Sequence, residues 1–258
     1  MIPLKDLNPS RRPPVVTVSL IALNALFFLY ELSLGPQLGP FLQQAAFVPA
    51  RAFTDPGVGS LGGEGLSILL SMFLHGGWAH FLGNMLFLWV FGDNIEDRLG
   101  HGRFVVFYLG AGYAAAFAHA ALNAGSTLPA IGASGAISGV LGAYLLLHPR
   151  APIVTLVFLG FFITTVRIPA LVYLPLWFGL QLVSGVASLA ARTGTSGAEA
   201  GGVAFFAHVG GFVAGVGLLK LLDRGPQGPP PPPEDRGPGR VIELDPSRDR
   251  TSPRRYRR

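Results

Sequence analysis

The sequence predicts an all-α polytopic membrane protein, a bundle of six transmembrane helices with a long membrane-associated first loop. Half of the 258 residues are hydrophobic and only 13% are charged, whereas about a quarter of the residues of a soluble domain are charged. Apolar stretches long enough to cross a bilayer recur along the chain, separated by Gly, Pro and charged residues. Cysteine is absent, which excludes disulfides, thiol chemistry and cysteine-based metal sites.

Composition divides the chain into three parts. Residues 1–14 form a polar cytoplasmic segment, residues 15–222 the six-helix membrane domain, and residues 223–258 a Pro- and Arg-rich cytoplasmic tail. The tail contains five consecutive prolines and almost no apolar clusters, so we expect it to be disordered. Residues 224–258 hold nine arginines and five acidic residues, a balance of +4 out of the net +5. The positive charge therefore does not indicate a nucleic-acid partner.

The spans are predicted from the apolar runs, in chain order. Residues 15–34 form the first, because about 20 apolar residues cross a hydrocarbon core of ~30 Å. Residues 35–77 contain many Gly and Pro but also Phe and Leu, so we expect a loop partly sunk in the membrane interface, with a short helix near residues 66–74. The other five spans are expected at about residues 78–91, 104–122, 133–147, 169–191 and 203–222.

Two segments between the spans need separate interpretation. Residues 93–103 hold Asp, Glu and Arg side chains, and we predict a polar turn after the second span. Residues 151–166 are apolar, but only 16 residues separate Arg150 from Arg167, fewer than the usual 17–25 of a transmembrane helix. We interpret this β-branched, Phe-rich segment as an interfacial or re-entrant piece.

The distribution of Lys and Arg predicts the orientation. These residues concentrate before the first span and after the second, fourth and sixth, whereas the other loops carry only Arg51 and Arg192. Positive residues favour cytoplasmic loops, so both termini are expected in the cytoplasm, and the second, fourth and sixth spans run inward from the outer face. We expect a multi-pass protein of a bacterial inner membrane.

Three polar residues fall at one depth on these three spans. His80, Ser134 and His208 precede Asp93, His148 and Asp223, at the inner ends of their spans, by 13, 14 and 15 residues. At ~1.5 Å per residue, each lies about 20 Å above the inner face. Serine and histidine at one level are the parts needed for nucleophilic catalysis, in which the histidine takes the serine proton.

Small-residue pairs predict that the fourth and sixth spans pack closely. Glycines four residues apart let helix backbones touch in lipid. The pairs are Gly135 with Gly139 and Gly211 with Gly215. Each pair begins just after a candidate, Ser134 or His208, so packing through these faces would bring the hydroxyl within hydrogen-bond reach of the imidazole.

A site for the oxyanion of a tetrahedral intermediate is also predicted. Ser134 begins a span, where backbone N–H groups have no partner within the helix. His80 and Asn84 are four residues apart and share one face of the second span. Donors of this kind stabilise the negative oxygen that develops during acyl transfer.

Each candidate also has an ordinary structural interpretation. Taken alone, a serine in a Gly-rich membrane helix is usually a packing residue, and Asn84 could be an interhelical hydrogen-bonder. His119 and Asn123 lie near the outer end of the third span and suit a cap or a contact with water. Metal binding by His75, His80 and His208 is disfavoured because no carboxylate lies at their level, so no cofactor is expected.

Three motifs in order resemble the rhomboid family of intramembrane serine proteases, over about residues 15–222. They are His75-Gly76-Gly77-Trp78-Ala79-His80 with Asn84, Gly92, Glu96 and Gly100; then Gly132-Ala133-Ser134-Gly135; then Ala207-His208 with Gly211 and Gly215. The resemblance implies a six-helix core, a Ser134–His208 dyad without an acid, and an oxyanion site made by His80, Asn84 and the Ser134 N–H. It also implies transmembrane protein substrates and a water-filled cavity gated by the fifth helix.

The sequence departs from that family in two places. Many members have an aromatic residue four positions after the nucleophile that stacks on the histidine, and here that position is Ser138. A Trp-Arg pair common in the first loop is missing, because residues 35–77 contain no Trp. Neither residue carries out bond chemistry, but the positioning of the histidine must differ.

The function expected from the sequence is an intramembrane serine endopeptidase, with the lipid bilayer as its surroundings and an oligomeric state that the sequence leaves open. One alternative is a non-catalytic relative that binds membrane helices; it would predict loss of Ser134 or His208, and both are present. Another is a transporter or channel with a histidine proton relay, which would need more membrane carboxylates than Glu31 alone.

Overall fold

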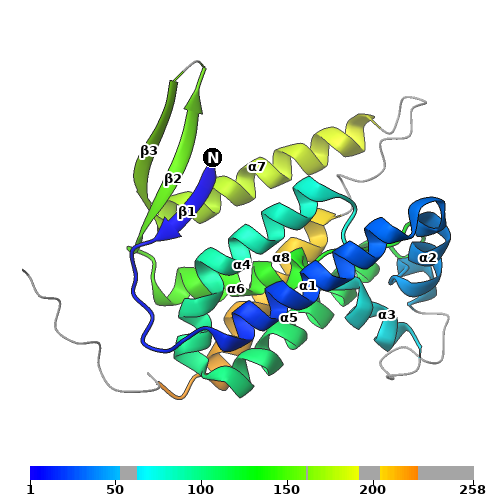
Figure 1. The fold of residues 1–258 in the computed structure, drawn as a ribbon, viewed down its shortest axis with the longest axis horizontal. Coiled ribbons are helices and arrows are strands. Elements are labelled where there is room, and N and C mark those ends of the chain that lie inside the picture. The colour runs from blue at the N-terminus through cyan, green and yellow to red at the C-terminus, as the bar shows by residue number, and fades with distance from the viewer. Residues whose placement is uncertain (53–62, 161, 192–203, 226–258) are drawn as a thin grey trace, which may run out of the picture. The chain divides into compact units, whose positions relative to one another are not determined.

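The structure, a computed structural model, describes residues 1–52, 63–160, 162–191 and 204–225, and these are mostly helical (Figure 1). The elements in chain order are β1 (Ile2–Asp6), α1 (Val15–Ser33), η1 (Gly35–Gln37), α2 (Leu38–Ala45), η2 (Pro49–Arg51), α3 (Glu64–Ser71), α4 (Trp78–Leu99), α5 (His101–Leu122), α6 (Ser134–Leu147), β2 (Pro152–Leu159), β3 (Phe162–Pro169), α7 (Ala170–Ala191) and α8 (Ala204–Leu222). Each segment predicted as a span forms a helix: α1, α4, α5, α6, α7 or α8. The predicted tail from residue 226 onward lies outside the described residues.

Helix α6 lies at the centre of the bundle. It contacts α4, α5 and α8, and every residue from Gly135 to Tyr144 is buried. Helix α8 packs against both α5 and α6, while α1 packs against α4. Aromatic and aliphatic side chains fill the space between these helices, among them Leu88, Phe91, Phe107 and Tyr144. The first residue of α6, Ser134, therefore stands at the start of the most enclosed helix.

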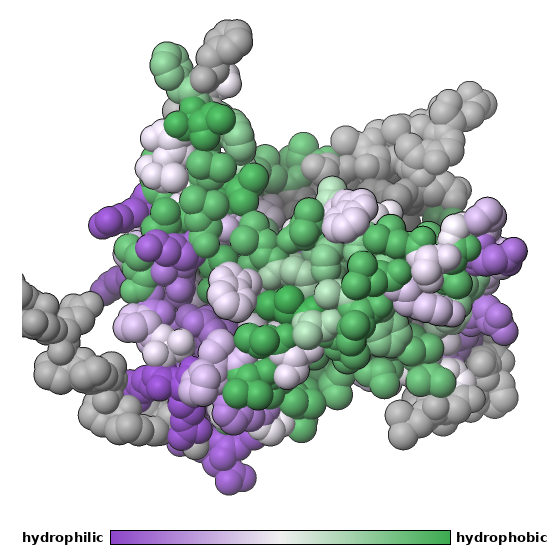
Figure 2. Space-filling model, in the orientation of Figure 1, coloured by the Kyte–Doolittle hydropathy of each residue, from purple (hydrophilic) through white to green (hydrophobic). Residues whose placement is uncertain are grey.

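The outer surface of the bundle is apolar, as expected for an integral membrane protein. Large hydrophobic side chains such as Leu26, Trp89, Val106 and Val213 are more than half exposed, and Figure 2 shows an apolar middle between polar ends. Among the described residues, α1, α5 and residues 205–222 of α8 are long and apolar enough to cross a membrane, and α6 and the first half of α7 are shorter apolar helices.

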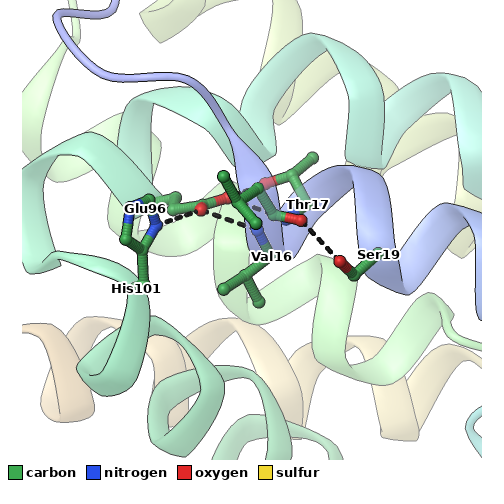
Figure 3. A network of polar contacts seen from close by, with 6 residues as sticks. Val16, Thr17, Ser19, Glu96 and His101 are labelled. Carbon is green, nitrogen blue, oxygen red and sulfur yellow. Dashed lines mark hydrogen bonds and ion pairs between the residues drawn. The ribbon is translucent and has the colours of Figure 1, made fainter.

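The prediction of a polar turn at residues 93–103 is wrong, because α4 continues as a helix to Leu99. Glu96, a residue of α4, is buried, and its carboxylate caps the N-terminus of α1 (Figure 3). Oε1 accepts the N–H of Val16 at 2.8 Å, and Oε2 accepts both the N–H and the hydroxyl of Thr17 at 2.7 Å. Nδ1 of His101 lies 2.6 Å from Oε1. A side chain distant in sequence thus supplies the cap that Pro14 cannot give α1.

An ion pair joins α4 to the end of α8 at the same end of the bundle. Nε and Nη2 of Arg98 each donate to one carboxylate oxygen of Asp223 at 2.8 Å. This hydrogen-bonded guanidinium lowers the pKa of the Asp223 carboxyl. Both partners are partly exposed, so the pair contributes about 1 kcal/mol or less.

Residues 151–166 form most of a β-hairpin, so the prediction of an all-α protein is corrected to a mostly helical one. The interpretation of this segment as an interfacial or re-entrant piece stays a prediction. Strands β2 and β3 pair antiparallel, and β1 from the N-terminus pairs antiparallel with β2, giving the order β1-β2-β3. The sheet is attached to the bundle by Ile153, which is fully buried, and by the hydroxyl of Tyr144, which donates to Asp6 at 2.7 Å. Burial raises the pKa of the Asp6 carboxyl to about 6.

The first loop contains the short helices α2 and α3. The helix predicted near residues 66–74 corresponds to α3, which begins and ends slightly earlier. Nε of Arg51 lies 2.8 Å from the Glu64 carboxylate, and the hydroxyl of Tyr113 donates to the Gly65 carbonyl at 2.7 Å. These contacts hold α3 against η2 and α5.

Candidate active site

A cavity of about 320 Å³ lies at the start of α6. Most of its lining is apolar or small, and its polar lining residues are Ser71, His80, His119 and Ser134. Helices α3, α4, α5, α6 and α8 all contribute to it. A space of this size has room for a side chain together with water, so Ser134 lines a volume large enough for part of a peptide substrate.

The loop before Ser134 is fixed by hydrogen bonds to α3. The N–H of Gly132 donates to the Ser71 carbonyl at 2.8 Å, and the Ser71 hydroxyl accepts the N–H of Phe47 at 2.7 Å. The N–H of Ala130 donates to the Phe47 carbonyl at 2.8 Å. Ser71 thus joins the loop at Phe47 to the loop before α6, a role that the sequence did not indicate.

The backbone at the start of α6 leaves amide groups available. The first bond within the helix runs from the N–H of Ile137 to the carbonyl of Ala133 at 3.0 Å. The N–H of Ser134 precedes it and has no acceptor within the helix, as is general for the first turn. The positive end of the helix dipole lies at the same place, so the position suits a developing negative charge.

His80 and Asn84 of α4 lie beside this loop. A methyl group built on Gly132 would stand 2.7 Å from Nε2 of His80 and 3.6 Å from Nδ2 of Asn84. The φ angle of Gly132 is +122°, a conformation that side-chain-bearing residues rarely adopt. Both side chains therefore approach the backbone two residues before Ser134, and within the described residues Nδ2 of Asn84 has no hydrogen-bond partner.

Helices α6 and α8 touch through their glycines. A methyl group built on Gly211 would stand 2.0 Å from the carbonyl oxygen of Gly135, and one built on Gly215 would stand 2.2 Å from that of Gly139. No side chain larger than hydrogen fits at these points. The contact lies next to Ser134 on α6 and one turn after His208 on α8.

His208 is buried on α8 close to this contact. In the described parts of the chain, neither of its ring nitrogens has a hydrogen-bond partner, and no hydrogen bond joins it to Ser134. Among the described residues it has an aromatic neighbour in Trp177 of α7, with ring centroids 6.3 Å apart and planes at 41°. Trp177 also packs on Phe87 of α4 at 5.0 Å.

Comparison with known proteins identifies the family. The model of the Rhomboid domain matches residues 62–224, which include Ser134 and His208. The chain belongs to the rhomboid family.

Several curated rhomboids are similar in sequence. Rhomboid protease GluP of Bacillus subtilis is 37% identical over 133 residues, 51% of this chain and 24% of the relative. Rhomboid protein 1, mitochondrial, of Saccharomyces cerevisiae is 29% identical over 209 residues, 79% of this chain and 52% of the relative. RHOMBOID-like protein 4 of Arabidopsis thaliana is 32% identical over 163 residues, 62% of this chain and 35% of the relative. The chain spans about a quarter to about half of the length of these relatives.

This rhomboid has no aromatic side chain at the position where many members stack one on the histidine. That position, Ser138, is fully buried on α6, and its hydroxyl has no hydrogen-bond partner among the described residues. The aromatic neighbour of His208 comes instead from Trp177. Sequence reasoning missed Trp177 because the two residues are 31 positions apart on different helices, and only the rarity of Trp, three in the chain, could have drawn attention to it.

Of the remaining polar candidates, His119 lines the cavity, whereas His75 and Asn123 occupy structural positions. Nδ2 of Asn123 donates to the carbonyl of His119 at 3.0 Å, at the end of α5. The N–H of His75 is directed to the carboxylate of Glu31, 3.0 Å from both oxygens. Among the described residues, no group of three or more His, Asp or Glu side chains is arranged to hold a metal ion.

Proposed function

We propose that this rhomboid is an intramembrane serine endopeptidase in which Ser134 is the nucleophile and His208 its base. The observation that carries the proposal is the position of Ser134, at the free N-terminal end of the central helix and on the wall of a cavity. The glycine contact between α6 and α8 favours a short path from Ser134 to His208. Family membership supports a protease, since one relative is named a rhomboid protease.

The chemistry follows the usual course of serine catalysis. His208 takes the proton of the Ser134 hydroxyl as the oxygen attacks the carbonyl carbon of the scissile peptide bond. The oxyanion is stabilised by the N–H of Ser134 and by donors from His80 and Asn84, whose side chains lie by the preceding loop. Collapse of the intermediate gives the proton to the leaving amine and an acyl group on Ser134. Water then releases that acyl group in the second half of the cycle.

The topology that goes with this function has six spans and both termini in the cytoplasm. Helices α4, α6 and α8 then begin at the outer side and carry His80, Ser134 and His208 near their starts. We place the protein in a bacterial inner membrane. Its substrates are transmembrane segments of other proteins, and small or helix-breaking residues near the cut make unwinding of the segment less costly.

The proposal is tested by cleavage of a reconstituted transmembrane substrate and by fluorophosphonate labelling. Ser134→Ala and His208→Ala should abolish both signals while thermal unfolding in detergent stays close to that of the parent. Matched controls are Ser138→Ala, one turn further along the same helix, and His148→Ala, just after its other end. Both controls should cleave and label normally. Undiminished cleavage by Ser134→Ala or His208→Ala would refute the dyad.

A non-catalytic membrane-helix-binding protein is the second candidate. It is favoured by the absence, among the described residues, of a hydrogen bond between Ser134 and His208. Catalytic hydrogen bonds are often long before substrate binds, so a dyad without this bond is compatible with a protease as well. Such a protein would show neither fluorophosphonate labelling of Ser134 nor cleavage, yet would still co-purify with transmembrane segments.

A further inference from the structure

The outer half of the β2–β3 hairpin presents an apolar surface that no described residue covers. Phe158, Phe162 and Ile163 are 52%, 78% and 64% exposed. Figure 1 shows the hairpin leaving the bundle where α7 begins, with its tip extending beyond the helices. In Figure 2 its described part is largely hydrophobic.

Both faces of the hairpin are apolar at the tip. Phe158 is paired with Ile163, so these two side chains share one face of the sheet. Phe162 is adjacent to Ile163 in the strand and lies on the other face. An antiparallel hairpin with one face in water alternates polar and apolar side chains. The tip of this hairpin is therefore suited to an apolar medium on both sides.

The surroundings of the hairpin indicate which medium this is. The face that carries Phe162 continues toward the base of the sheet with Ile153 and Thr155, both fully buried against the bundle. Helix α7 follows β3 directly and exposes Leu171 and Val172, on a bundle whose outer surface faces lipid. The apolar tip is thus continuous with a lipid-facing surface and projects from the edge of a membrane-embedded bundle.

Basic side chains lie across the base of the sheet. Lys5 and Arg167 are both register partners of Val154, one on each side, so the three form a row on one face. Both cations are exposed, as is Arg150 just before β2. This row of Lys5, Val154 and Arg167 lies on the face opposite to Ile153 and Thr155. With the tip of the hairpin among the acyl chains, the row would lie at the level of the lipid phosphate groups. Each exposed cation near an anionic surface contributes to binding.

We propose that the β2–β3 hairpin is a lipid-binding element of this protein. Its tip, with Phe158, Phe162 and Ile163, inserts into the leaflet at the charged end of the bundle, and Lys5 and Arg167 bind anionic phospholipid headgroups. The inference depends on the protein being embedded in a membrane and not on its being a protease. The main competing occupant is a second copy of the chain, paired along the free edge of β3.

The absence of cysteine makes a site-specific test direct. Phe162→Cys, labelled with the environment-sensitive dye NBD, is reconstituted in vesicles of phosphatidylcholine and phosphatidylglycerol and exposed to acyl-brominated lipid. Leu26→Cys on the exposed face of α1 is the lipid reference. Gly102→Cys is the water reference, because this exposed residue lies between His101 and Arg103 at the polar start of α5 and a methyl group built there has nothing within 4 Å. Because Phe162 is exposed, its replacement leaves the core intact, which thermal unfolding of the labelled protein checks.

Bromolipid should quench the dye at position 162 to an extent close to that at Leu26 and well above that at Gly102. Omitting phosphatidylglycerol should reduce this quenching, and the double variant Lys5→Gln, Arg167→Gln should remove the dependence on phosphatidylglycerol. Quenching no greater than at Gly102 would overturn the proposal. So would a dye shielded from water but insensitive to bromolipid, which indicates a second copy. Dependence on phosphatidylglycerol that persists in the double variant would overturn the assignment of the two cations.

Discussion

Replacing Gly211 by alanine should push α8 away from α6 at the glycine contact beside the candidate catalytic residues. The added methyl carbon would stand 2.0 Å from the carbonyl oxygen of Gly135 and 3.0 Å from its carbonyl carbon. Contacts of a Cβ atom below 3.0 Å are essentially never seen, so at least 3.0 − 2.0 = 1.0 Å of movement is required. Both obstacles are backbone atoms, which cannot rotate away as the end of a side chain could.

The expected effects are a loss of stability and a larger loss of activity. Overpacking of this kind costs about 1–3 kcal/mol, partly offset by about 0.5–1 kcal/mol because alanine is the better helix former. A displacement of about 1 Å between reacting groups can lower the rate about 100-fold. Gly211→Ala should therefore unfold at a lower temperature in detergent and cleave a reconstituted substrate about 100-fold more slowly.

Gly217 on the same helix provides the matched control. Nothing lies within 4 Å of a methyl group built there, so Gly217→Ala should cleave normally and be as stable as the parent or slightly more stable. A Gly211→Ala protein with the melting temperature and the cleavage rate of Gly217→Ala would refute the proposed backbone contact. A Gly211→Ala protein that is less stable yet fully active would be consistent with the backbone contact but would refute its role in placing His208.

Two further predictions concern the neighbours of the site and the sheet. Trp177→Ala should slow cleavage and alter its pH profile, because His208 loses its aromatic neighbour. Trp177→Phe keeps a ring at this position and should retain most of the rate. Equal rates for the parent and both variants would exclude a positioning role of Trp177. The Asp6 carboxyl has a pKa raised by burial from 3.8 to about 6, so its contribution to stability is complete below pH 3.8 and is lost as the pH rises through 6. The melting temperature of Asp6→Asn should therefore decrease less between pH 4 and pH 7 than that of the parent. An equal decrease in the two proteins would contradict this prediction.

The helices could be predicted because a bilayer demands apolar segments of a fixed length. The predicted second span ended at residue 91, however, and α4 continues to Leu99. The reason is a partner distant in sequence: Glu96 binds amides of α1 about 80 positions earlier. In a hydropathy profile, a carboxylate such as Glu96 indicates the end of a transmembrane helix. The residues around Glu96 do not indicate that it caps the start of α1.

The sheet lies beyond sequence reasoning for a similar reason. Residues 151–166 are apolar on both faces, so the alternation that marks a half-buried strand is missing. Strand β1 finds its partner about 150 positions later, at Ile2↔Leu156. Ser134, His80 and His208 could be put forward as site residues because they share a depth that can be counted along each span, and their catalytic roles stay a prediction. Trp177 could not be found by counting, since only the packing of α7 brings it toward His208.

The carboxylate of Glu96 also places a constraint on biosynthesis. The N–H groups of Val16 and Thr17 are made first, and the side chain that accepts from them is made 80 and 79 residues later. As α1 leaves the ribosome, its first turn has only water for these amides. These two amides therefore gain their protein acceptor only after α4 has been made. A chain interrupted before residue 96 should therefore leave the first turn of α1 without this cap.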